Sequence, residues 1–297
     1  MYEEIINLIK CPFCESKLSL AEISKEGDEI IHGRVVCECG NDWLIESGVL
    51  KFDVNEQEDT NQWSKIIEEV GSYTKLNEII KEKTPKNQKE LGKEAIDHVI
   101  KYINHKSPNY ILDIATGRGT LLENLVGHLR SEIHMVCTDL SFFVLKEDRK
   151  VIKKNFPNVK VSYIACDAKD LPFIDNSFDL IVTFHGVANM RDVIPEALQE
   201  INRVLKKGKN FDFLDISILV KPHSKSVEEL KQFYNERGIY EVEDFITEKG
   251  FKNFHKKAGF HSLHLKILKS TIAEENELDL IPVKGDWFTI GILYTKK

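Results

Sequence analysis

Three aspartates and a glycine-rich turn are the residues of this 297-residue sequence that can do chemistry together. The stretch NYILDIATGRGTLLENL combines an apolar run that ends with Asp113, a turn that contains Gly117 and Gly119, and the start of an amphipathic helix. Glycines in such a turn let a ligand approach the backbone, where a Cβ atom would collide. Asp139 and Asp167 end the next two apolar runs. The pattern predicts a ligand site along one edge of a sheet.

Each acid suits a different part of a nucleoside ligand. Asp139 can accept hydrogen bonds from two ribose hydroxyls, although an acid at this place also suits NAD. A dinucleotide fingerprint has a third glycine, and Leu122 occupies that position. Asp113 would repel a pyrophosphate but stabilise an ammonium group, and Asp167 is placed to accept from an adenine amino group. A ligand with an ammonium, a ribose and an adenine, but no phosphate, fits all three acids.

The elements expected to position these residues are seven strands that alternate with helices. Five apolar runs, nearly all apolar on both faces, are typical of a parallel sheet covered by helices: YILDI, HMVCTD, VKVSYIAC, FDLIVTF and NFDFLDIS. Two alternating runs, HSLHLKIL and DWFTIGILYT, are expected to form an antiparallel pair at one edge. The sequence therefore predicts an α/β fold with a doubly wound, mostly parallel, seven-stranded sheet.

Residues from about 88 to 297 resemble the class I S-adenosylmethionine-dependent methyltransferases, which have a Rossmann-like fold. LDIATGRGT resembles their first motif, with Ala115 in place of the usual first glycine. CTDLS resembles the acidic second motif, and ACDAKDLPFIDNSFDLIVTF resembles the third and fourth. EINRVLKKGKNFDFLD and KKAGF resemble the segments that follow. The resemblance covers about two-thirds of the chain, and the motifs occur in the family's order.

The resemblance implies that the cofactor is S-adenosylmethionine. Asp139 would bind its ribose, Leu140 would flank the adenine, and the turn from Ala115 to Gly119 would meet the methionine part. For any single acid, the alternative is that it only caps the next helix. The cofactor-binding residues expected on this basis are Asp113, Ala115, Gly117, Gly119, Asp139, Leu140, Asp167, Ala168 and Phe184.

The methyl acceptor is less well defined by the sequence. The fourth strand is followed by HGVANM, without the Asn/Asp-Pro-Pro-aromatic motif of enzymes that methylate exocyclic amino groups of bases. His185 is the candidate catalytic residue, a general base for a hydroxyl or amine acceptor; the alternative is that it packs against the cofactor. Methyl transfer by direct displacement depends mainly on proximity. Trp63 and Tyr73 are expected to act either as a lid or as docking anchors, and residues 221–245 either line an acceptor pocket or form a surface helix.

Four cysteines crowd into the first 40 residues: Cys11, Cys14, Cys37 and Cys39. In a reducing compartment this clustering favours a metal over disulfides. The segment resembles the zinc ribbons that activate tRNA and protein methyltransferases and the zinc-binding N-terminus of bacterial ribosomal-RNA guanine methyltransferases. The resemblance implies a structural zinc ion on the four thiolates. The second pair has one intervening residue where two are usual, so His32 as a substitute ligand, or a ribbon without metal, stays open.

Composition divides the chain into three parts: a zinc-ribbon-like, β-rich domain over residues 1–52, a polar linker with short helices over 53–87, and the methyltransferase domain over 88–297. The formal charge of −7 provides no general attraction to nucleic acid. No run of about 18 apolar residues predicts a membrane span. The acidic N-terminus differs from a secretion signal, so a cytoplasmic location is expected.

The sequence predicts an enzyme that transfers a methyl group to a small-molecule or peptide acceptor. One alternative is a ribosomal or transfer RNA methyltransferase that uses the ribbon to bind its substrate. A second is a non-catalytic regulatory subunit that binds the cofactor, although a decayed site has no need for three intact acids. An NAD-dependent oxidoreductase is disfavoured by Leu122 and by the missing Tyr-x-x-x-Lys. The acceptor atom, the oligomeric state and the pathway are left open.

Overall fold

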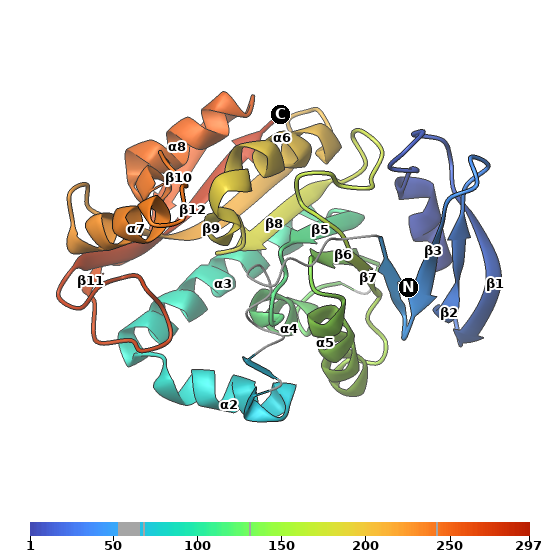
Figure 1. Ribbon diagram of the computed structural model, residues 1–297, viewed down its shortest axis with the longest axis horizontal. Coiled ribbons are helices and arrows are strands. Elements are labelled where there is room, and N and C mark those ends of the chain that lie inside the picture. The colour runs from blue at the N-terminus through green and yellow to red at the C-terminus, as the bar shows by residue number, and fades with distance from the viewer. Residues whose placement is uncertain (53–65, 68, 131, 242) are drawn as a thin grey trace.

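The protein is built on one continuous sheet. The computed structural model describes residues 1–52, 66–67, 69–130, 132–241 and 243–297. Among these residues the sheet has twelve strands, in the order β1-β2-β3-β4-β7-β6-β5-β8-β9-β12-β10, with β11 paired to β12 (Figure 1). No helix of the described part is long and apolar enough to cross a membrane.

The central strands are parallel and buried on both faces, as their double-sided apolar sequences predict. Nearly every residue of the inner four strands is buried. Five central strands run parallel, in the spatial order β7 (Val161–Ala165), β6 (His134–Asp139), β5 (Tyr110–Ile114), β8 (Leu180–Phe184) and β9 (Asp212–Val220). Their carboxyl ends therefore meet at one edge of the sheet, where ligands bind in open α/β folds.

The predicted antiparallel pair is confirmed at the far side of the sheet. β12 (Trp287–Lys296) runs antiparallel to β9, and β10 (His261–Ile267) runs antiparallel to β12. A two-residue strand, β11 (Thr271–Ile272), also pairs with β12. Cys137 and Cys166, the two cysteines outside the first 40 residues, are buried in or directly after strands.

Helices cover both faces of the sheet, so the fold is doubly wound as predicted. On one side lie α3 (Lys86–Lys106), α4 (Thr120–Val126) and α5 (Phe142–Asn155); on the other lie α6 (Ile194–Val204) and α8 (Glu248–Lys257) (Figure 1). α7 (Lys225–Asn235) follows β9. A side-chain oxygen caps the N-terminus of several of these helices and accepts a backbone N–H that the helix itself leaves unpaired. The capping residues are Ser141 of α5, Ser224 of α7 and Thr247 of α8.

Residues 1–52 extend this same sheet, so the predicted count of seven strands is too low for the sheet as a whole. After the short 3₁₀ helix η1 (Glu3–Leu8), four strands form an antiparallel meander: β1 (Ser19–Glu26), β2 (Glu29–Val36), β3 (Asp42–Glu46) and β4 (Val49–Lys51). β4 then pairs in parallel with β7, with Val49 opposite Tyr163. One hydrophobic core runs through both parts of the chain.

Glu29 ties the N-terminal strands to helix α5. Its buried carboxylate accepts a hydrogen bond from Arg149 Nε at 2.8 Å and pairs with Lys153 Nζ at 3.0 Å. Burial acts to raise the pKa of Glu29, but the hydrogen bond from Arg149 and the surrounding positive charges lower it to about 2. The ionised carboxylate is therefore part of what holds β2 against α5.

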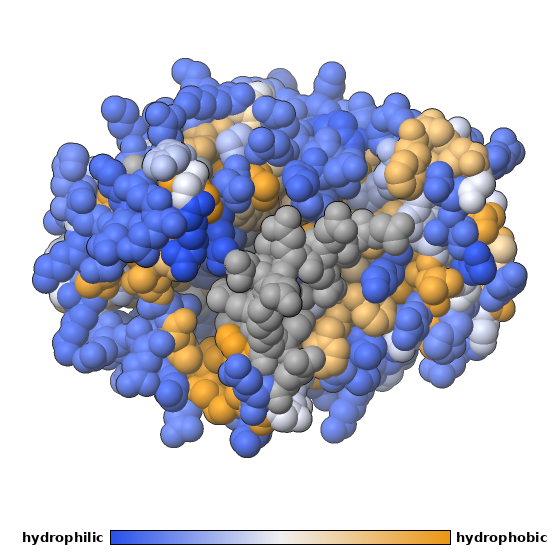
Figure 2. All heavy atoms as spheres, in the orientation of Figure 1, coloured by the Kyte–Doolittle hydropathy of each residue, from blue (hydrophilic) through white to orange (hydrophobic). Residues whose placement is uncertain are grey.

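Helix α2 (Tyr73–Lys83) lies in the segment where the sequence predicts a polar linker with short helices. Ser72 caps it, and it packs on α5 through a second apolar cluster that includes Tyr73, Leu76 and Val144. Figure 2 shows a mainly hydrophilic face, with apolar side chains gathered at the bottom of the view, where Figure 1 places α2. Trp63 lies outside the described residues, so the expectation of a lid or docking anchor there stays a prediction.

Candidate functional site

The three predicted acids meet at the carboxyl edge of the sheet. Asp113 lies in β5, Asp139 ends β6, and Asp167 follows β7 by two residues. The strands are neighbours in register, with Asp113 opposite Cys137 and Asp139 opposite Ala165. The backbone N–H of Cys166 also donates to the carbonyl of Asp139 at 3.0 Å. The fold thus brings together three acids that are far apart in the sequence.

The glycine turn between β5 and α4 has a left-handed backbone at three places. The φ angles are 50° at Ala115, 57° at Gly117 and 64° at Gly119. A Cβ atom on Gly119 would lie 2.9 Å from the Asp148 carboxylate, whereas on Gly117 it would meet nothing closer than 3.8 Å. Gly119 is therefore needed for both its conformation and its close packing on α5, and Gly117 for its conformation.

Asp139 fastens this turn to β6. Its two carboxylate oxygens accept the backbone N–H groups of Gly117 and of Ser141, each at 2.9 Å. The N–H of Thr116 donates to the carbonyl of Thr138, also at 2.9 Å. These bonds fix the predicted ribose-binding acid and the predicted methionine-binding turn relative to one another.

Asp113 is a buried carboxyl group that lacks a full set of partners. Only 1 % of the residue is exposed, and its Oδ2 atom has no hydrogen-bond partner among the described residues. Burial, together with the negative charge of Asp139, raises the pKa of Asp113 to about 7, against the effect of a hydrogen bond from Thr116. Since a buried acceptor without a donor is costly, this atom is suited to a cationic or hydrogen-bonding ligand group.

The predicted adenine side of the site is more open. Leu140 and Ala168 are half-buried. One oxygen of the half-exposed Asp167 accepts the backbone N–H of Lys169 at 3.0 Å, and the other lies 3.3 Å from the Nζ of the same lysine. This carboxylate is therefore held in place at the surface end of β7.

Two aromatic rings lie where β8 ends. The rings of Phe184 and His185 are 4.3 Å apart, and both residues are half-buried. His185 has a φ of 61°, and its N–H donates to the carbonyl of Ile216 at 2.7 Å. Desolvation lowers the pKa of His185 to about 4, so the ring is neutral at pH 7. Helix α3 passes over this place, since a Cβ atom on Gly92 would lie 3.7 Å from the Phe184 ring.

Helix α2 is bonded directly to the glycine turn. The hydroxyl of Tyr73 donates to Asp148, the carboxyl beneath Gly119, and Arg118 of the turn donates to Asn77 Oδ1 at 2.9 Å. Tyr73 is thus a buried docking residue. Sequence reasoning missed Asp148. A signal existed, because this acid lies at helical spacing from the apolar residues that face the core, three positions after Leu145 and four before Ile152.

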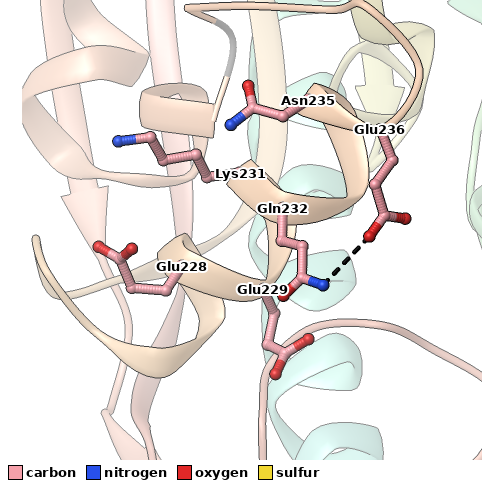
Figure 3. Close-up of a pocket in the computed structure, with 6 residues that line it drawn as sticks. All are labelled: Glu228, Glu229, Lys231, Gln232, Asn235 and Glu236. Carbon is pink, nitrogen blue, oxygen red and sulfur yellow. Dashed lines mark hydrogen bonds between the residues drawn. The ribbon is translucent and has the colours of Figure 1, made fainter.

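The described part of the segment 221–245 contains α7 and the start of the 3₁₀ helix η3 (Glu243–Ile246). The Arg237 guanidinium lies 3.7 Å from the centre of the Phe233 ring, and Arg191 lies 5.7 Å from the same centre. A surface pocket on α7 is drawn in Figure 3, where Gln232 donates to Glu236. All six residues that line the pocket belong to α7 or directly follow it, and none is a strand-end acid.

The four N-terminal cysteines converge on one point. Their sulfur atoms all lie within 4.8 Å of one another; Cys11 and Cys39 are 3.7 Å apart, and Cys14 and Cys37 are 3.4 Å apart. Four thiolates at about 2.3 Å from a tetrahedral zinc ion would be about 3.8 Å apart, so this cluster fits such an ion. The short Cys-x-Cys spacing does not prevent convergence, and His32 is not part of the cluster.

Comparison with known proteins agrees with this geometry. The sequence profile of the ubiE/COQ5 methyltransferase family matches residues 52–274. The 2-phytyl-1,4-naphtoquinone methyltransferase of Nostoc punctiforme is 28 % identical over 158 residues, which are 52 % of this chain and 67 % of that protein. The demethylmenaquinone methyltransferase of Porphyromonas gingivalis is 31 % identical over 150 residues, or 50 % of this chain and 59 % of its own length.

A solved structure agrees in fold. That of the CurJ carbon methyltransferase covers 79 % of this chain and 61 % of its own, with a TM-score of 0.53 and 15 % sequence identity. The Rossmann-like fold predicted from the sequence is therefore confirmed. The family match begins at residue 52 and so leaves the cysteine cluster outside it.

Proposed function

Because the chain belongs to the ubiE/COQ5 methyltransferase family, and is thus an S-adenosylmethionine-dependent enzyme, we propose that it methylates a small molecule with a quinone-type ring. Two relatives are named for such acceptors, a naphthoquinone and a demethylmenaquinone. The rings of Phe184 and His185, 4.3 Å apart and inclined by 60°, support the proposal, because each has an aromatic face that a planar ring can contact. A peptide or an RNA is the competing acceptor class.

The observation that carries the cofactor assignment is the set of three acids on adjacent strand ends. The buried Oδ2 of Asp113 would accept from the cofactor's ammonium group, which is the donor that it lacks among the described residues. Asp139 would hold the ribose. Asp167, with Leu140 and Ala168, would border the adenine, and the turn from Ala115 to Gly119 would follow the methionine part. Phe184 would close the site at the methyl end.

S-adenosylmethionine supplies an activated methyl group, so the protein has to hold the acceptor atom in line with it. The neutral His185 ring offers one nitrogen that accepts a hydrogen bond. With a pKa of about 4, His185 is suited to orient an acceptor hydroxyl by accepting its hydrogen bond, and is a weak base for removing the proton completely. The position of its backbone is fixed by the hydrogen bond to Ile216.

An assay with three acceptor classes tests this function. The protein and S-adenosylmethionine are incubated with a hydroxylated naphthoquinone, a peptide mixture, or tRNA and ribosomal-RNA transcripts, and the products are examined by mass spectrometry. We expect a gain of one methylene unit on the quinone alone. His185→Gln should lower kcat by about tenfold or more while leaving cofactor affinity unchanged; His261→Gln, on the exposed edge strand, is the matched control. Methylation of RNA or peptide alone would contradict the proposal.

We also propose that Cys11, Cys14, Cys37 and Cys39 hold a structural zinc ion. The convergence of the four sulfur atoms supports it, as does the hydrogen bond from Asn41 Nδ2 to Cys39 Sγ at 3.2 Å, which is the kind of outer contact that orients a ligand. Inductively coupled plasma mass spectrometry should find one zinc ion per chain in the purified protein. The double variant Cys14→Ser/Cys39→Ser should lose it, and Cys137→Ala, in a core strand, should keep it.

A further inference from the structure

The backbone next to the first cysteine pair is bonded to the loop on the adenine side of the site. The N–H of Lys10, the residue before Cys11, donates to the carbonyl of Pro172 at 2.9 Å. The N–H of Ile174 donates back to the carbonyl of Leu8, also at 2.9 Å. Together with the antiparallel bridge between Ile9 and Phe173, these bonds make a short two-stranded contact.

A second contact holds the same loop at its other end. The N–H of Phe52, directly after β4, donates to the carbonyl of Ala165 at 3.0 Å. Ala165 is the last residue of β7 and is followed by Cys166 and Asp167. β4 is reached from Cys37 and Cys39 through the single strand β3. The N-terminal segment is therefore bonded to residues 166–174 at both ends. Cys11 directly follows Lys10 of the first contact, and Cys37 and Cys39 precede β3, the partner of β4.

The remaining side of the loop is fixed by helix α6. Arg203 donates to the carbonyls of Leu171 and Phe173, at 2.8 Å and 2.6 Å, and Glu200 accepts the N–H of Leu171 at 2.9 Å. Between these contacts lie Asp167 and Ala168, the residues assigned to the adenine. Their position thus depends on α6 from one side and on the N-terminal segment from the other.

The two-stranded contact next to Cys11 is well packed but short. Ile9 is 2 % exposed and Phe173 is fully buried, where it meets Phe178 edge to face. The chain from Cys11 onward turns back at once, with the N–H of Glu15 donating to the carbonyl of Cys11 and a bridge joining Lys10 to Lys17. A metal that joins Cys11 to Cys14, Cys37 and Cys39 would lock this turn to the β2–β3 turn, because its ligands come from both.

We propose that metal at the four cysteines positions the adenine-side loop, residues 166–174, and so raises the affinity of the cofactor site. The inference rests on the proposed zinc and cofactor sites. If the two sites are coupled in this way, the effect is reciprocal, so that bound cofactor also strengthens metal binding by the same factor. Couplings of this kind typically change affinity by about 5- to 150-fold.

The test compares zinc-loaded and zinc-depleted full-length protein. Binding of S-adenosylhomocysteine is measured by calorimetry, and amide hydrogen exchange is measured in residues 166–174, with β12 as the reference segment. We expect zinc removal to weaken binding at least fivefold and to speed exchange in the loop but not in β12. Equal affinity and equal exchange in the two forms would overturn the inference.

The failures of the premises can be told apart from the failure of the coupling. If purified protein does not retain zinc, the metal site is disproved. If zinc-loaded protein does not bind S-adenosylhomocysteine, the cofactor site is disproved. Either result also overturns the inference. Two bound ligands without mutual effect disprove the coupling alone.

If zinc removal unfolds the protein, a pair of variants that keep all four cysteines tests the inference instead. Ile9→Ala weakens the two-stranded contact with Phe173 and leaves every cysteine in place. Ile5→Ala is the control, because it removes an equally buried isoleucine of η1 that is not part of the bridge. Ile9→Ala should keep its zinc, bind S-adenosylhomocysteine several-fold more weakly and exchange faster at 166–174. Identical behaviour of the two variants would overturn the inference.

Discussion

At the scale of the residue, the protonation of Asp113 decides how well an ammonium group is bound. Its pKa is raised to about 7 by burial and by Asp139, so below that pH the cofactor-free protein carries a neutral carboxyl that must lose its proton before it can form an ion pair. We therefore expect the affinity for S-adenosylhomocysteine to fall by about tenfold per pH unit below about pH 7, and to level off above it.

Calorimetry across this pH range checks the expectation. Asp113→Asn should bind weakly at every pH, with the slope removed, because its amide does not titrate. An unchanged affinity across the range in the native protein would show that Asp113 does not face the ammonium group.

The site residues that could be predicted follow a local sequence pattern, whereas those that could not depend on packing between distant segments. Asp113, Asp139 and Asp167 each follow an apolar run, and parallel strands bring such ends together, so the cluster could be predicted. The need for glycine at position 119 could not be predicted. A Cβ atom there would collide with the carboxyl group of Asp148, which lies 29 positions later on another element. Such a contact depends on how α5 packs, which no local pattern encodes.

At the scale of the element, the hydroxyl of Tyr73 holds α2 against Asp148 of α5, the carboxyl group beneath Gly119. Tyr73→Phe keeps the buried ring but removes the donor to Asp148, whose other oxygen already lacks a partner among the described residues. Since a buried acceptor left without its donor costs about 1–3 kcal/mol, we expect a loss of this size in the free energy of unfolding. The KM for S-adenosylmethionine should also rise several-fold, because Asp148 lies beneath Gly119.

Denaturant unfolding and steady-state kinetics separate these two effects. Tyr102→Phe is the control, because the Tyr102 hydroxyl lies near a buried carboxyl group, that of Asp212, away from the glycine turn. It should lose stability without a change in KM. A KM that moves equally in both variants would show that the Tyr73 bond has no special connection to the cofactor turn.

Most elements could be predicted because their sequence patterns are long and regular. The buried parallel strands are continuous apolar runs, and the helices between them have apolar faces and capping residues such as Ser141. β4 could not be predicted. It has three residues, too few for a periodic pattern, and its partner β7 begins more than one hundred positions later.

At the scale of the whole molecule, the cysteine-rich segment and the methyltransferase part share one sheet and one core, joined at Glu29. Glu29→Gln would leave Arg149 and Lys153 without their buried carboxylate, so we expect the free energy of unfolding to fall by about 3 kcal/mol. Because the pKa of Glu29 is lowered from 4.5 to about 2, its contribution is complete above about pH 4.5 and is lost as the pH falls toward 2.

Urea unfolding at neutral pH and at about pH 3 measures this contribution. The difference between the native protein and Glu29→Gln should shrink at the lower pH. Glu275→Gln, which breaks an exposed pair with Lys284, should have little effect at either pH. A loss no larger than that of Glu275→Gln would show that Glu29 does not hold the two parts together.

Binding of S-adenosylmethionine at the three strand-end acids is tested most directly by calorimetric titration with S-adenosylmethionine, S-adenosylhomocysteine and NAD. Asp139→Asn is compared with Asp179→Asn, since Asp179 also accepts two backbone N–H groups, at the start of β5 and so at the opposite edge of the sheet. We expect micromolar binding of both adenosyl ligands and none of NAD, and at least tenfold weaker binding, or about 1.4 kcal/mol, in Asp139→Asn alone. An affinity for the adenosyl ligands that is unchanged in Asp139→Asn, or a higher affinity for NAD, would contradict this site.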